Sequence, residues 1–482
     1  MLQVSEKEII NRFIFDNPWW ENNAVDERFV NFPRRSYFPL FEKLVKDKSV
    51  NRAIILMGPR RVGKTVMVYH TIDGLLHGSV NGKAILYVSL ETPIFTGLSL
   101  DKLIALFKEH FNHQRDDDLF IFFDEIQYLK NWEVHLKSLV DSYPAYRFVA
   151  TGSAAAALRL KSSESGAGRF SDFMLPPLTF AEYLRFINLE EELLQIVKVE
   201  KEDDTSEEYK VIDIDKLNKE FVKYLNYGGY PEAVFSLTIQ TDSARFIKSD
   251  IIDKVLLRDL PSLYGINDIQ ELNRLFTTIA YNTGNEITLE ALAQTSGVAK
   301  NTLKRYLEYL EAAFLIRRVN RIDQNARHFK RVTSFKVYLT NPSMRAALFG
   351  YIDESNDALG ALTETAIYGQ WLHSDFIDSL YYSRWNSGEV DIVALGSKSQ
   401  KPYWCVEVKW SDRPLIDPSL LSNVIDFAKR NSIRTPVTVT TKTKSGSISM
   451  SGVDIKFRPS SEYAYVLGKN ILKIKSLPGN IA

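Results

Sequence analysis

One short stretch of the chain constrains its fold more than any other: an apolar run, a glycine-bounded loop and the start of a helix. The apolar residues 53–57 have the composition of a buried strand, and the residues after Thr65 have the pattern of a helix. The loop between them fits the spacing G-x-x-x-x-G-K-[ST]. Glycines let such a loop turn its backbone N–H groups toward phosphate oxygens, and the dipole of the following helix adds to the attraction. The stretch therefore predicts a nucleotide-binding site.

The side chains of this loop have different expected roles. Lys64 is expected to reach the β- and γ-phosphates of ATP, and Thr65 is expected to hold Mg²⁺. The residues expected to contact the nucleotide here are Gly58, Pro59, Arg60, Arg61, Val62, Gly63, Lys64, Thr65 and Val66.

A second apolar run, residues 119–123, ends in Asp124 and Glu125. Because a doubly wound sheet places its site at the carboxyl ends of its strands, Asp124 is expected to hold the Mg²⁺ shell and Glu125 to polarise the attacking water. The alternative is a strand that only exits into solvent at an acidic pair. A further strand at 146–153 ends in the hydroxyl residues Thr151 and Ser153, which are suited to sensing the γ-phosphate from a neighbouring strand. Strands that alternate with helices predict a parallel α/β sheet.

Length and composition limit the other possibilities. A chain of 482 residues is too long for one ordinary domain. The formal net charge is zero, so contact with nucleic acid must come from local basic patches. Cys405 is the only cysteine, which excludes a disulfide within the chain. The chain starts without an apolar signal region and has no apolar run long enough to span a membrane, so a soluble cytoplasmic protein is expected.

In combination, these motifs resemble the AAA-type ATPases of archaea and bacteria that carry an uncharacterised C-terminal domain. The matching stretches are 58–65, 124–127 with Trp132, 150–153, 168–170 and 228–232. The resemblance implies an AAA+ core with a helical lid and, in part of the family, a nuclease-like C-terminal fold. It also implies that Arg169 stabilises γ-phosphate charge, in cis or in trans, unless it is a loop arginine without a catalytic part. A homo-oligomer, such as a ring, is expected by this analogy alone.

Residues 287–319 predict a winged helix-turn-helix. An apolar-faced helix at 289–293 is followed by a turn with Gly297 and by a second helix at 301–313. The N-terminal half of a recognition helix meets the major groove of DNA, and the polar residues in or near that half are Lys300, Asn301, Lys304 and Arg305. The alternative is a module that packs against other domains.

The C-terminal region has a second constellation. Residues 381–385 and 389–395 are expected to form neighbouring strands, and 403–409 a third. Glu407 and Lys409 are two residues apart and share one face of that strand, where Asp391 can meet them. The pattern resembles the PD-(D/E)xK nuclease fold, in which Asp391 and Glu407 would hold Mg²⁺ or Mn²⁺ and Lys409 would orient or deprotonate water. Glu364, on a helix at 361–372, matches the extra acidic residue of some members. The alternative is a structural relic of the fold or a salt-bridged edge strand.

The expected fold is α/β, with a P-loop AAA+ core, a helical lid, a winged helix-turn-helix and a PD-(D/E)xK-like domain. Its expected parts are an N-terminal brace at 1–48, the core at 49–177, the lid at 178–270, the winged helix at 271–335 and the nuclease-like domain at 336–482. Helical patterns cover 178–197, 214–225 and 244–256, and the acidic residues 200–208 are expected to form a solvated loop. The brace would be packed by Phe13, Phe15, Trp19 and Trp20.

Together these features predict an ATP-dependent DNA-processing protein with an ATPase and a metal-dependent phosphodiesterase. Two alternatives remain open. One is an ATP-dependent switch or scaffold that binds a protein partner and has an inactive nuclease-like domain. The other is an ATP-regulated transcription factor that uses only the winged helix.

Overall fold

The computed structural model describes residues 4–152, 168–201, 204–329 and 333–475. The chain forms two compact units, residues 1–176 and 177–482, which is within one residue of the expected end of the ATPase core. Ser153 lies outside the described residues. Among the described helices, none combines the length and the apolar composition needed to cross a membrane.

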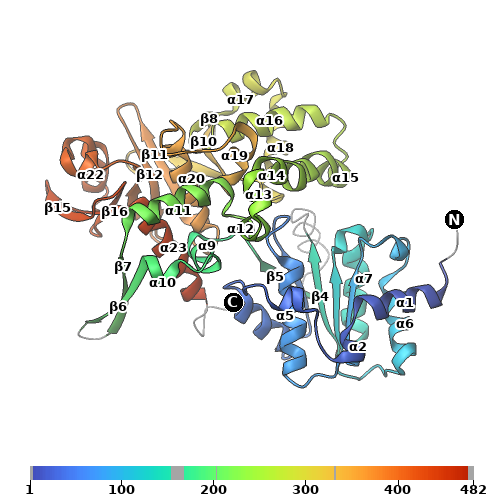
Figure 1. The fold of residues 1–482 in the computed structure, drawn as a ribbon. Coiled ribbons are helices and arrows are strands. Elements are labelled where there is room, and N and C mark those ends of the chain that lie inside the picture. Colours follow the sequence, from blue (N-terminus) through green and yellow to red (C-terminus); the bar gives the residue numbers. More distant parts are fainter. Residues whose placement is uncertain (1–3, 153–167, 202–203, 330–332, 476–482) are drawn as a thin grey trace. The chain divides into compact units, whose positions relative to one another are not determined.

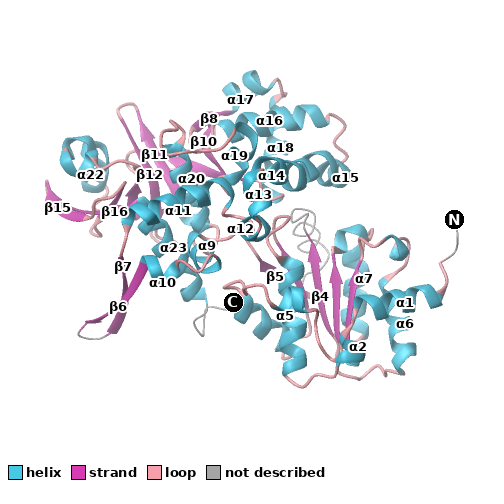
Figure 2. Cartoon of the chain, in the orientation of Figure 1, coloured by secondary structure: helices cyan, strands magenta, loops and turns pink. Residues whose placement is uncertain are grey.

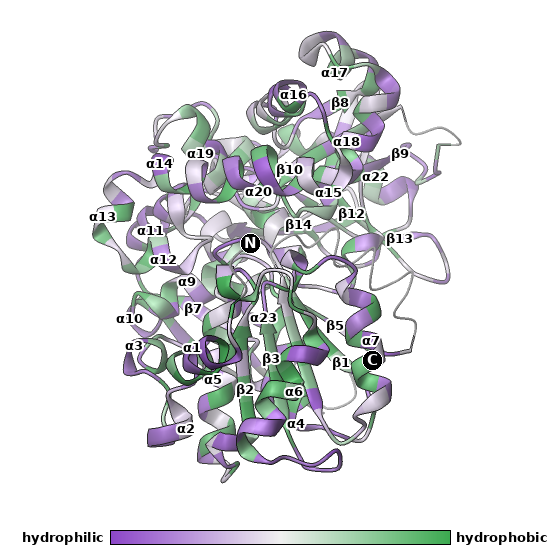
Figure 3. Cartoon of the chain, turned by 90° about the vertical axis from the view of Figure 1, so that its right-hand side faces the viewer, coloured by the Kyte–Doolittle hydropathy of each residue, from purple (hydrophilic) through white to green (hydrophobic). Residues whose placement is uncertain are grey.

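The first unit is built on a parallel five-stranded sheet with strand order β2-β3-β4-β1-β5 (Figure 1). Strands β1 to β4 are almost entirely buried, whereas β5 is only partly buried. Figure 3 shows the apolar character of β1 to β3 in green. Helix α5 packs against α3 and α4, whereas α6 packs against α1 and α7. This confirms the expected alternation of strands and helices. The bounds are α1 Glu6–Asp16, α2 Trp19–Asn22, α3 Glu27–Val30, α4 Phe38–Lys46, β1 Ala53–Met57, α5 Lys64–His77, β2 Ile85–Ser89, α6 Leu100–Phe111, β3 Phe120–Asp124, α7 Trp132–Ser142, β4 Arg147–Gly152 and β5 Phe170–Met174.

The N-terminal segment closes the β2 edge of this sheet. The indole N–H groups of Trp19 and Trp20 donate to the carbonyl oxygen of Ile85 at 3.2 and 2.7 Å. The side chain of Asn17 donates to the carbonyl oxygen of Tyr87 and accepts from its N–H. An open strand edge presents unpaired backbone groups, so these side chains complete the pairing of β2. Of the four aromatic residues expected in the brace, Phe13, Trp19 and Trp20 are buried and Phe15 is exposed.

The second unit contains a nine-stranded mixed sheet with order β15-β16-β14-β13-β12-β11-β9-β10-β8 (Figure 2). Its C-terminal half packs against α22, and the buried residues of that core include Cys405, Phe427 and Val439. The bounds in this half are α19 Ser343–Phe349, α20 Leu359–Trp371, β11 Leu380–Trp385, β12 Gly388–Leu395, β13 Pro402–Glu407, α21 Arg413–Ile416, α22 Ser422–Arg430, β14 Val437–Thr441, β15 Gly446–Met450, β16 Val453–Pro459 and α23 Ser460–Lys475.

The elements expected for a helix-turn-helix occur in the other half of this sheet. They are α16 Ile269–Tyr281, β8 Glu286–Thr288, α17 Leu289–Ser296, α18 Lys300–Ala312, β9 Ile316–Ile322 and β10 Ser334–Leu339. Gly297, at φ +73°, ends α17, as the turn requires. Strand β10 pairs with β8 and β9, and β9 pairs with β11. The expected boundary at 335/336 therefore cuts through a strand of one continuous sheet.

The region expected to be a lid differs from the prediction at one place. The acidic residues 200–208 were expected to form a solvated loop, and 178–197 a helix. Instead, strands β6 (Leu194–Lys201) and β7 (Asp204–Val211) form an antiparallel pair apart from the large sheet. The helical elements around this pair are α9 Phe180–Phe186, α10 Glu190–Leu193, α11 Ile214–Tyr227, α12 Pro231–Phe235, α13 Leu237–Thr241, α14 Ser243–Ile247, the π-helical turns Lys248–Asp253 and Val255–Asp259, and α15 Leu260–Tyr264.

Candidate functional site

The glycine-bounded loop connects β1 to the N-terminus of α5, as its spacing predicts. A Cβ atom on Gly58 would lie 2.2 Å from the carbonyl oxygen of Leu175, so only glycine fits there. Gly63 has a φ of +93°, a conformation that glycine adopts without strain. The ammonium of Lys64 donates to the carbonyl oxygens of Gly58 and Pro59 at 3.0 and 2.7 Å. The lysine thus lies within the curve of the loop, where phosphate groups are expected.

Asp124 ends β3 beside this loop and is held by three hydroxyl groups. Thr65 and Tyr87 each donate to its Oδ2 at 2.9 Å, and Thr151 donates to its Oδ1. Burial and the neighbouring charge of Glu125 raise the pKa of Asp124, and the three hydrogen bonds oppose that shift. Because neutral hydroxyls orient the carboxylate without cancelling its charge, the Thr65–Asp124 pair fits the residues expected to hold Mg²⁺.

Glu125 follows in a left-handed backbone conformation, with φ +55°. Such a conformation costs a non-glycine residue about 1–3 kcal/mol and is typical of functional sites. Its N–H donates to Thr151 Oγ1 at 3.2 Å, and its carboxylate accepts from the side chain of Gln127. The sequence did not predict the contacts of Tyr87 and Gln127, whereas Thr151 was expected near the γ-phosphate as a hydroxyl residue at the end of an apolar strand.

A further contact that the sequence did not predict holds the nucleotide loop in place. The buried guanidinium of Arg35 donates to the carbonyl oxygens of Val62 and Pro176 at 2.7 and 3.0 Å. It therefore ties the loop to the segment that follows β5. No local pattern around Arg35 marks this role.

Arg169 lies near the N-terminal ends of β1 and β5, whereas the nucleotide loop follows the C-terminal end of β1. It directly precedes β5, its carbonyl oxygen accepts from the N–H of Ala53 at 2.9 Å, and its guanidinium pairs with Asp141. Ala53 begins β1, whereas the loop follows the end of β1, so the length of a strand, roughly 15 Å, separates Arg169 from the loop. This placement does not support a role in cis, and a role in trans stays a prediction.

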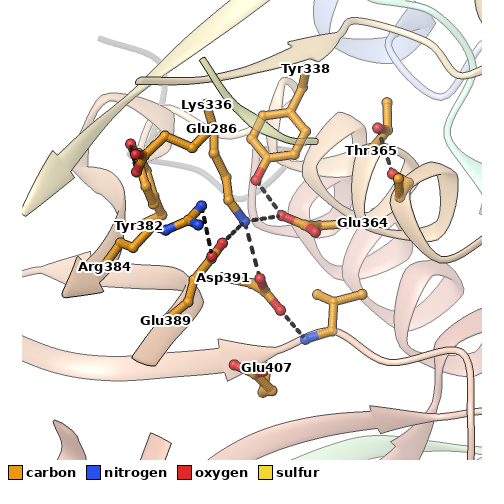
Figure 4. A network of polar contacts seen from close by, with 12 residues as sticks. Glu286, Lys336, Tyr338, Glu364, Thr365, Tyr382, Arg384, Glu389, Asp391 and Glu407 are labelled. Atoms are coloured by element: carbon orange, nitrogen blue, oxygen red, sulfur yellow. Dashed lines mark hydrogen bonds and ion pairs between the residues drawn. The ribbon is translucent and has the colours of Figure 1, made fainter. Parts of the chain in front are cut away.

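The four acidic and basic residues expected at the C-terminal site come together, and Figure 4 shows the three acidic ones, Glu364, Asp391 and Glu407. Glu364 lies on α20, Asp391 on β12 and Glu407 at the end of β13, while Lys409 follows two residues later. The Lys409 ammonium lies 2.7 Å from Glu407 Oε1 and 4.0 Å from Asp391 Oδ2. The N–H of Val408 donates to Asp391 Oδ2 at 2.9 Å. We call this group the carboxylate cluster.

Strand β10 adds a lysine that sequence reasoning missed. The Lys336 ammonium lies 2.8 Å from Glu364 Oε1, 3.1 Å from Asp391 Oδ1 and 2.5 Å from Glu389 Oε1. Tyr338 lies two residues along the same strand and donates to Glu364 Oε1 at 2.5 Å. Residues two apart on a strand share a face, so a lysine and a tyrosine within an apolar strand were the available signal.

The pKa values of the residues in the carboxylate cluster are shifted in opposite directions. Burial, and then the charge of Asp391, raise the pKa of Glu364 to about 7 and that of Glu407 to about 8. Burial acts on Asp391 in the same sense, but the Lys336 and Lys409 ammoniums outweigh it and lower its pKa. The carboxylates outweigh the burial of the two lysines and raise their pKa values. Both lysines are therefore ammonium ions at neutral pH.

One atom of the carboxylate cluster has the environment of a metal ligand. Glu407 Oε2 is buried and accepts no hydrogen bond from the described residues. A buried carboxylate oxygen without a partner is costly, and a divalent cation would satisfy it. Within the described part of the chain, no three carboxylate, imidazole or thiol groups lie together as a ready-made metal site. Asp391 and Glu407 fit a cation as a pair, with Lys336 on the far side of Asp391.

Helix α18 presents the polar residues expected to contact DNA. Lys300, Asn301, Lys304 and Arg305 are exposed, whereas Leu303, Tyr306, Leu307 and Leu310 are buried on the other face. Lys300 forms a surface ion pair with Glu290 at 2.7 Å. The basic residues are therefore available at the surface of the unit.

Comparison with known proteins agrees with the geometry of the loop. Residues 50–184 match a family profile described as an AAA domain, and residues 218–355 match a domain of unknown function, DUF8612. The first match covers the loop, Asp124 and Glu125. The chain therefore contains an AAA-type P-loop ATPase domain, a class that binds nucleotide.

The full-length relatives have no described function. The chain is 23% identical over 399 residues to an uncharacterized protein of Methanocaldococcus jannaschii, covering 78% of this chain and 83% of that one. It is also 23% identical over 314 residues to an uncharacterized protein of Haemophilus influenzae, covering 64% and 72%. A Walker-type ATPase of Pyrococcus abyssi is similar in structure at a TM-score of 0.38, with 15% identity over 66% of this chain and 95% of that one.

Proposed function

We propose that this protein couples ATP hydrolysis to metal-dependent cleavage of phosphodiester bonds in DNA. The observation that carries the proposal is the convergence of Asp391, Glu407 and Lys409 in a chain that also contains an AAA-type ATPase domain. In this group, one buried oxygen of Glu407 has no hydrogen-bond partner among the described residues. The finding for the ATPase domain is independent of the cleavage site.

At the nucleotide site, the residues divide the work of phosphoryl transfer. The loop N–H groups and Lys64 would bind the phosphates, and Thr65 and Asp124 would hold Mg²⁺, which supplies positive charge for the departing phosphate. Glu125, oriented by Gln127 and Thr151, would position and polarise the attacking water. Ser153 and an Arg169 from a second chain remain proposed contributors.

At the carboxylate cluster, Asp391 and Glu407 would hold Mg²⁺ or Mn²⁺, which would supply the charge that activates water near the scissile phosphate. Lys409 is 41% exposed at its side chain, so it can contact a phosphate or a water that approaches from outside. Asp391 is oriented by the Val408 N–H. Glu364 is held by Lys336 and Tyr338 and would support the arrangement from within.

We propose DNA as the substrate because of helix α18. The order of α16, β8, α17, α18, β9 and β10 supports a winged helix, and the exposed Lys300, Lys304 and Arg305 support α18 as its recognition helix. Strand β10 of this module carries Lys336 into the carboxylate cluster. DNA bound along α18 would therefore meet the same sheet that carries the cleavage residues.

The test is a cleavage assay on the full chain with labelled single-stranded, duplex and branched DNA, each with and without ATP and Mg²⁺ or Mn²⁺. RNA of the same forms serves as the comparison substrate. Cleavage is expected with metal, should stop with EDTA, and should be lost in Asp391→Asn, Glu407→Gln and Lys409→Ala. Preferential cutting of RNA would move the substrate class to RNA. Cleavage that survives all three substitutions would exclude the carboxylate cluster as its source.

A second function is supported by the same region. Lys336 already compensates part of the negative charge of the carboxylate cluster, as expected of a site retained for stability. The protein would then be an ATP-dependent switch or scaffold for a protein or DNA. Absence of metal-dependent cleavage on every DNA and RNA form, with ATP hydrolysis intact, selects this function.

The proposed role of Arg169 in trans has its own test. ATPase activity per chain should rise with protein concentration and follow oligomer formation by light scattering, and Arg169→Ala should abolish that rise. Activity that stays constant down to a demonstrated monomer would exclude a trans arginine.

A further inference from the structure

We infer that the carboxylate cluster binds one divalent cation, between Asp391 and Glu407, because Lys336 fills the neighbouring position between Glu364 and Asp391 with its own ammonium. The inference rests on the proposed metal site. It adds the number of ions that the site holds and the residue that sets this number.

The two oxygens of Asp391 face different partners. Oδ1 lies 3.1 Å from the Lys336 ammonium, whereas Oδ2 accepts from the Val408 N–H and lies 4.0 Å from the Lys409 ammonium. The carboxylate therefore has one side toward Glu364 and another toward Glu407, as Figure 4 shows. A second cation would need the first of these sides.

Lys336 occupies that side as a cation would. Its ammonium contacts Glu364, Glu389 and Asp391 at 2.5–3.1 Å, and the tyrosine hydroxyl of Tyr338 donates to the same oxygen of Glu364 that Lys336 contacts. A divalent ion bound there would have to share Glu364 and Asp391 with a positive charge that is already at hydrogen-bond distance. Like charges at such a distance repel strongly where water is excluded.

Lys336 is also enclosed within the cluster. Its side chain is 2% exposed, against 41% for Lys409. It extends from β10, which is paired on both sides, with β8 and β9. The exposed Lys409 can move aside when a cation or a phosphate enters, whereas Lys336 stays among its three carboxylates.

The side of Asp391 that faces Glu407 has, within the described parts of the chain, no buried lysine to fill it. Glu407 Oε2 is buried and has no hydrogen-bond partner among the described residues, and the ammonium nearest to Glu407 Oε1 is the exposed Lys409. A cation there gains an unsatisfied oxygen and displaces only a lysine that reaches solvent. The free energy of binding therefore favours this side.

The test counts Mn²⁺ bound to the full chain without nucleotide, by calorimetric titration and by the EPR signal of free Mn²⁺. Asp391→Asn serves as the baseline, so that Mn²⁺ bound elsewhere, including at Thr65 and Asp124, is subtracted. The wild type is expected to bind one more Mn²⁺ than this baseline. Lys336→Gln is expected to bind two more, and Lys442→Gln, which alters an exposed lysine of the same unit, is expected to match the wild type.

Affinity gives a second readout that does not need Lys336 to be replaced. Glu407→Gln removes a direct ligand and should weaken Mn²⁺ binding by more than the ~10–100-fold that loss of an outer partner costs. Glu364→Gln, whose carboxylate already pairs with Lys336, should weaken it by less than about 10-fold. This comparison decides the matter if Lys336→Gln fails to fold.

The possible failures are distinguishable. Two ions in the wild type, one ion in a folded Lys336→Gln variant, or equal losses in Glu364→Gln and Glu407→Gln would each overturn the role of Lys336 while leaving the metal site in place. No ion above the baseline in the wild type would remove the metal site itself, and with it the proposed cleavage.

Discussion

Asp124 and Asp391 are both buried aspartates at candidate metal sites, but the protein holds them with different groups. Three hydroxyls hold Asp124, and two ammoniums with one backbone N–H surround Asp391. The pKa of Asp124 is raised by burial and by Glu125, whereas the ammoniums lower that of Asp391. Neutral donors leave a carboxylate with its charge, so Asp124 would need a cation from outside to balance that charge. Asp391 is partly neutralised by the fold itself.

This difference predicts that substitutions at the nucleotide site affect mainly ligand binding and activity, whereas substitutions at the carboxylate cluster also affect stability. Removal of a neutral donor from Asp124 costs one hydrogen bond, while removal of Lys336 leaves three carboxylates facing one another without their shared cation. The nucleotide site is therefore expected to respond to substitution mainly in activity, and the carboxylate cluster in both activity and stability.

The largest expected effect is on hydrolysis at Glu125. Because an amide cannot polarise water as a carboxylate does, Glu125→Gln should lower the ATPase rate by about 10²–10⁴-fold while ATP still binds. Fluorescent-nucleotide titration and phosphate release measure the two quantities. Lys64→Ala is the paired variant, in which binding should fall as well. Hydrolysis at the wild-type rate in Glu125→Gln would reject the assigned carboxylate.

The two aspartates should be separable by activity. Asp124→Asn should lower ATP hydrolysis by about 10²–10³-fold, as for other lost electrostatic contacts to a transition state, and Asp391→Asn should leave hydrolysis without DNA near the wild-type rate. Both variants are measured by phosphate release without DNA. A matching loss in Asp391→Asn would show that the two sites are not independent and would break the comparison.

The stability contrast is tested at Lys336. Lys336→Gln should destabilise the protein by about 3–5 kcal/mol, because it leaves buried charge without its partner. Lys442→Gln, which breaks the exposed pair with Glu354, should cost only about 0–1 kcal/mol. Chemical denaturation followed by fluorescence compares them. Equal costs would mean that Lys336 is not a structural counter-charge.

The third region to compare with the two sites is α18. Replacing Lys300, Lys304 and Arg305 by alanine should weaken DNA binding and flatten its salt dependence by about 0.9 in the logarithmic slope for each lost phosphate contact. Fluorescence anisotropy across a salt series measures both. Unchanged affinity and slope would assign this helix to packing against another protein surface.

The smallest effect is expected at a neutral donor. Tyr87→Phe removes one hydroxyl from Asp124, and one hydrogen bond contributes about 0.5–1.5 kcal/mol, so the ATPase rate should fall only severalfold. Phosphate release at saturating ATP measures it. A loss as large as that of Asp124→Asn would show that the tyrosine does more than orient the carboxylate.

The sequence predicted the two sites to different extents for a physical reason. The nucleotide loop is one contiguous segment, so residue spacing alone specifies it. Asp391, Glu407 and Lys409 could be found because strand periodicity puts them on facing positions. Lys336 could not be placed, since no strand was expected at 334–339 and only tertiary pairing brings it to Asp391.

One further miss has a related cause. The acidic composition of 200–208 is typical of a solvated loop, but residues 200–201 and 204–208 belong to the β6–β7 pair, which lies outside the large sheet. Even the apolar residues Ile196 and Val197 of β6 are exposed. A strand with two solvated faces lacks the apolar alternation that identifies strands. The local sequence around Arg169 does not reveal at which end of β5 it lies, so it could not separate a role in cis from a role in trans.

The continuous nine-stranded sheet limits which segments of the chain could be exchanged between genes without disrupting it. Strand β10 hydrogen-bonds to β8 and β9 but contributes Lys336 and Tyr338 to a group on α20 and β12. A recombination event that exchanged residues 271–335 for those of another gene would keep Lys336 while removing both strands that hold it. We therefore expect the helix-turn-helix elements and the carboxylate cluster to be inherited together as one structural unit.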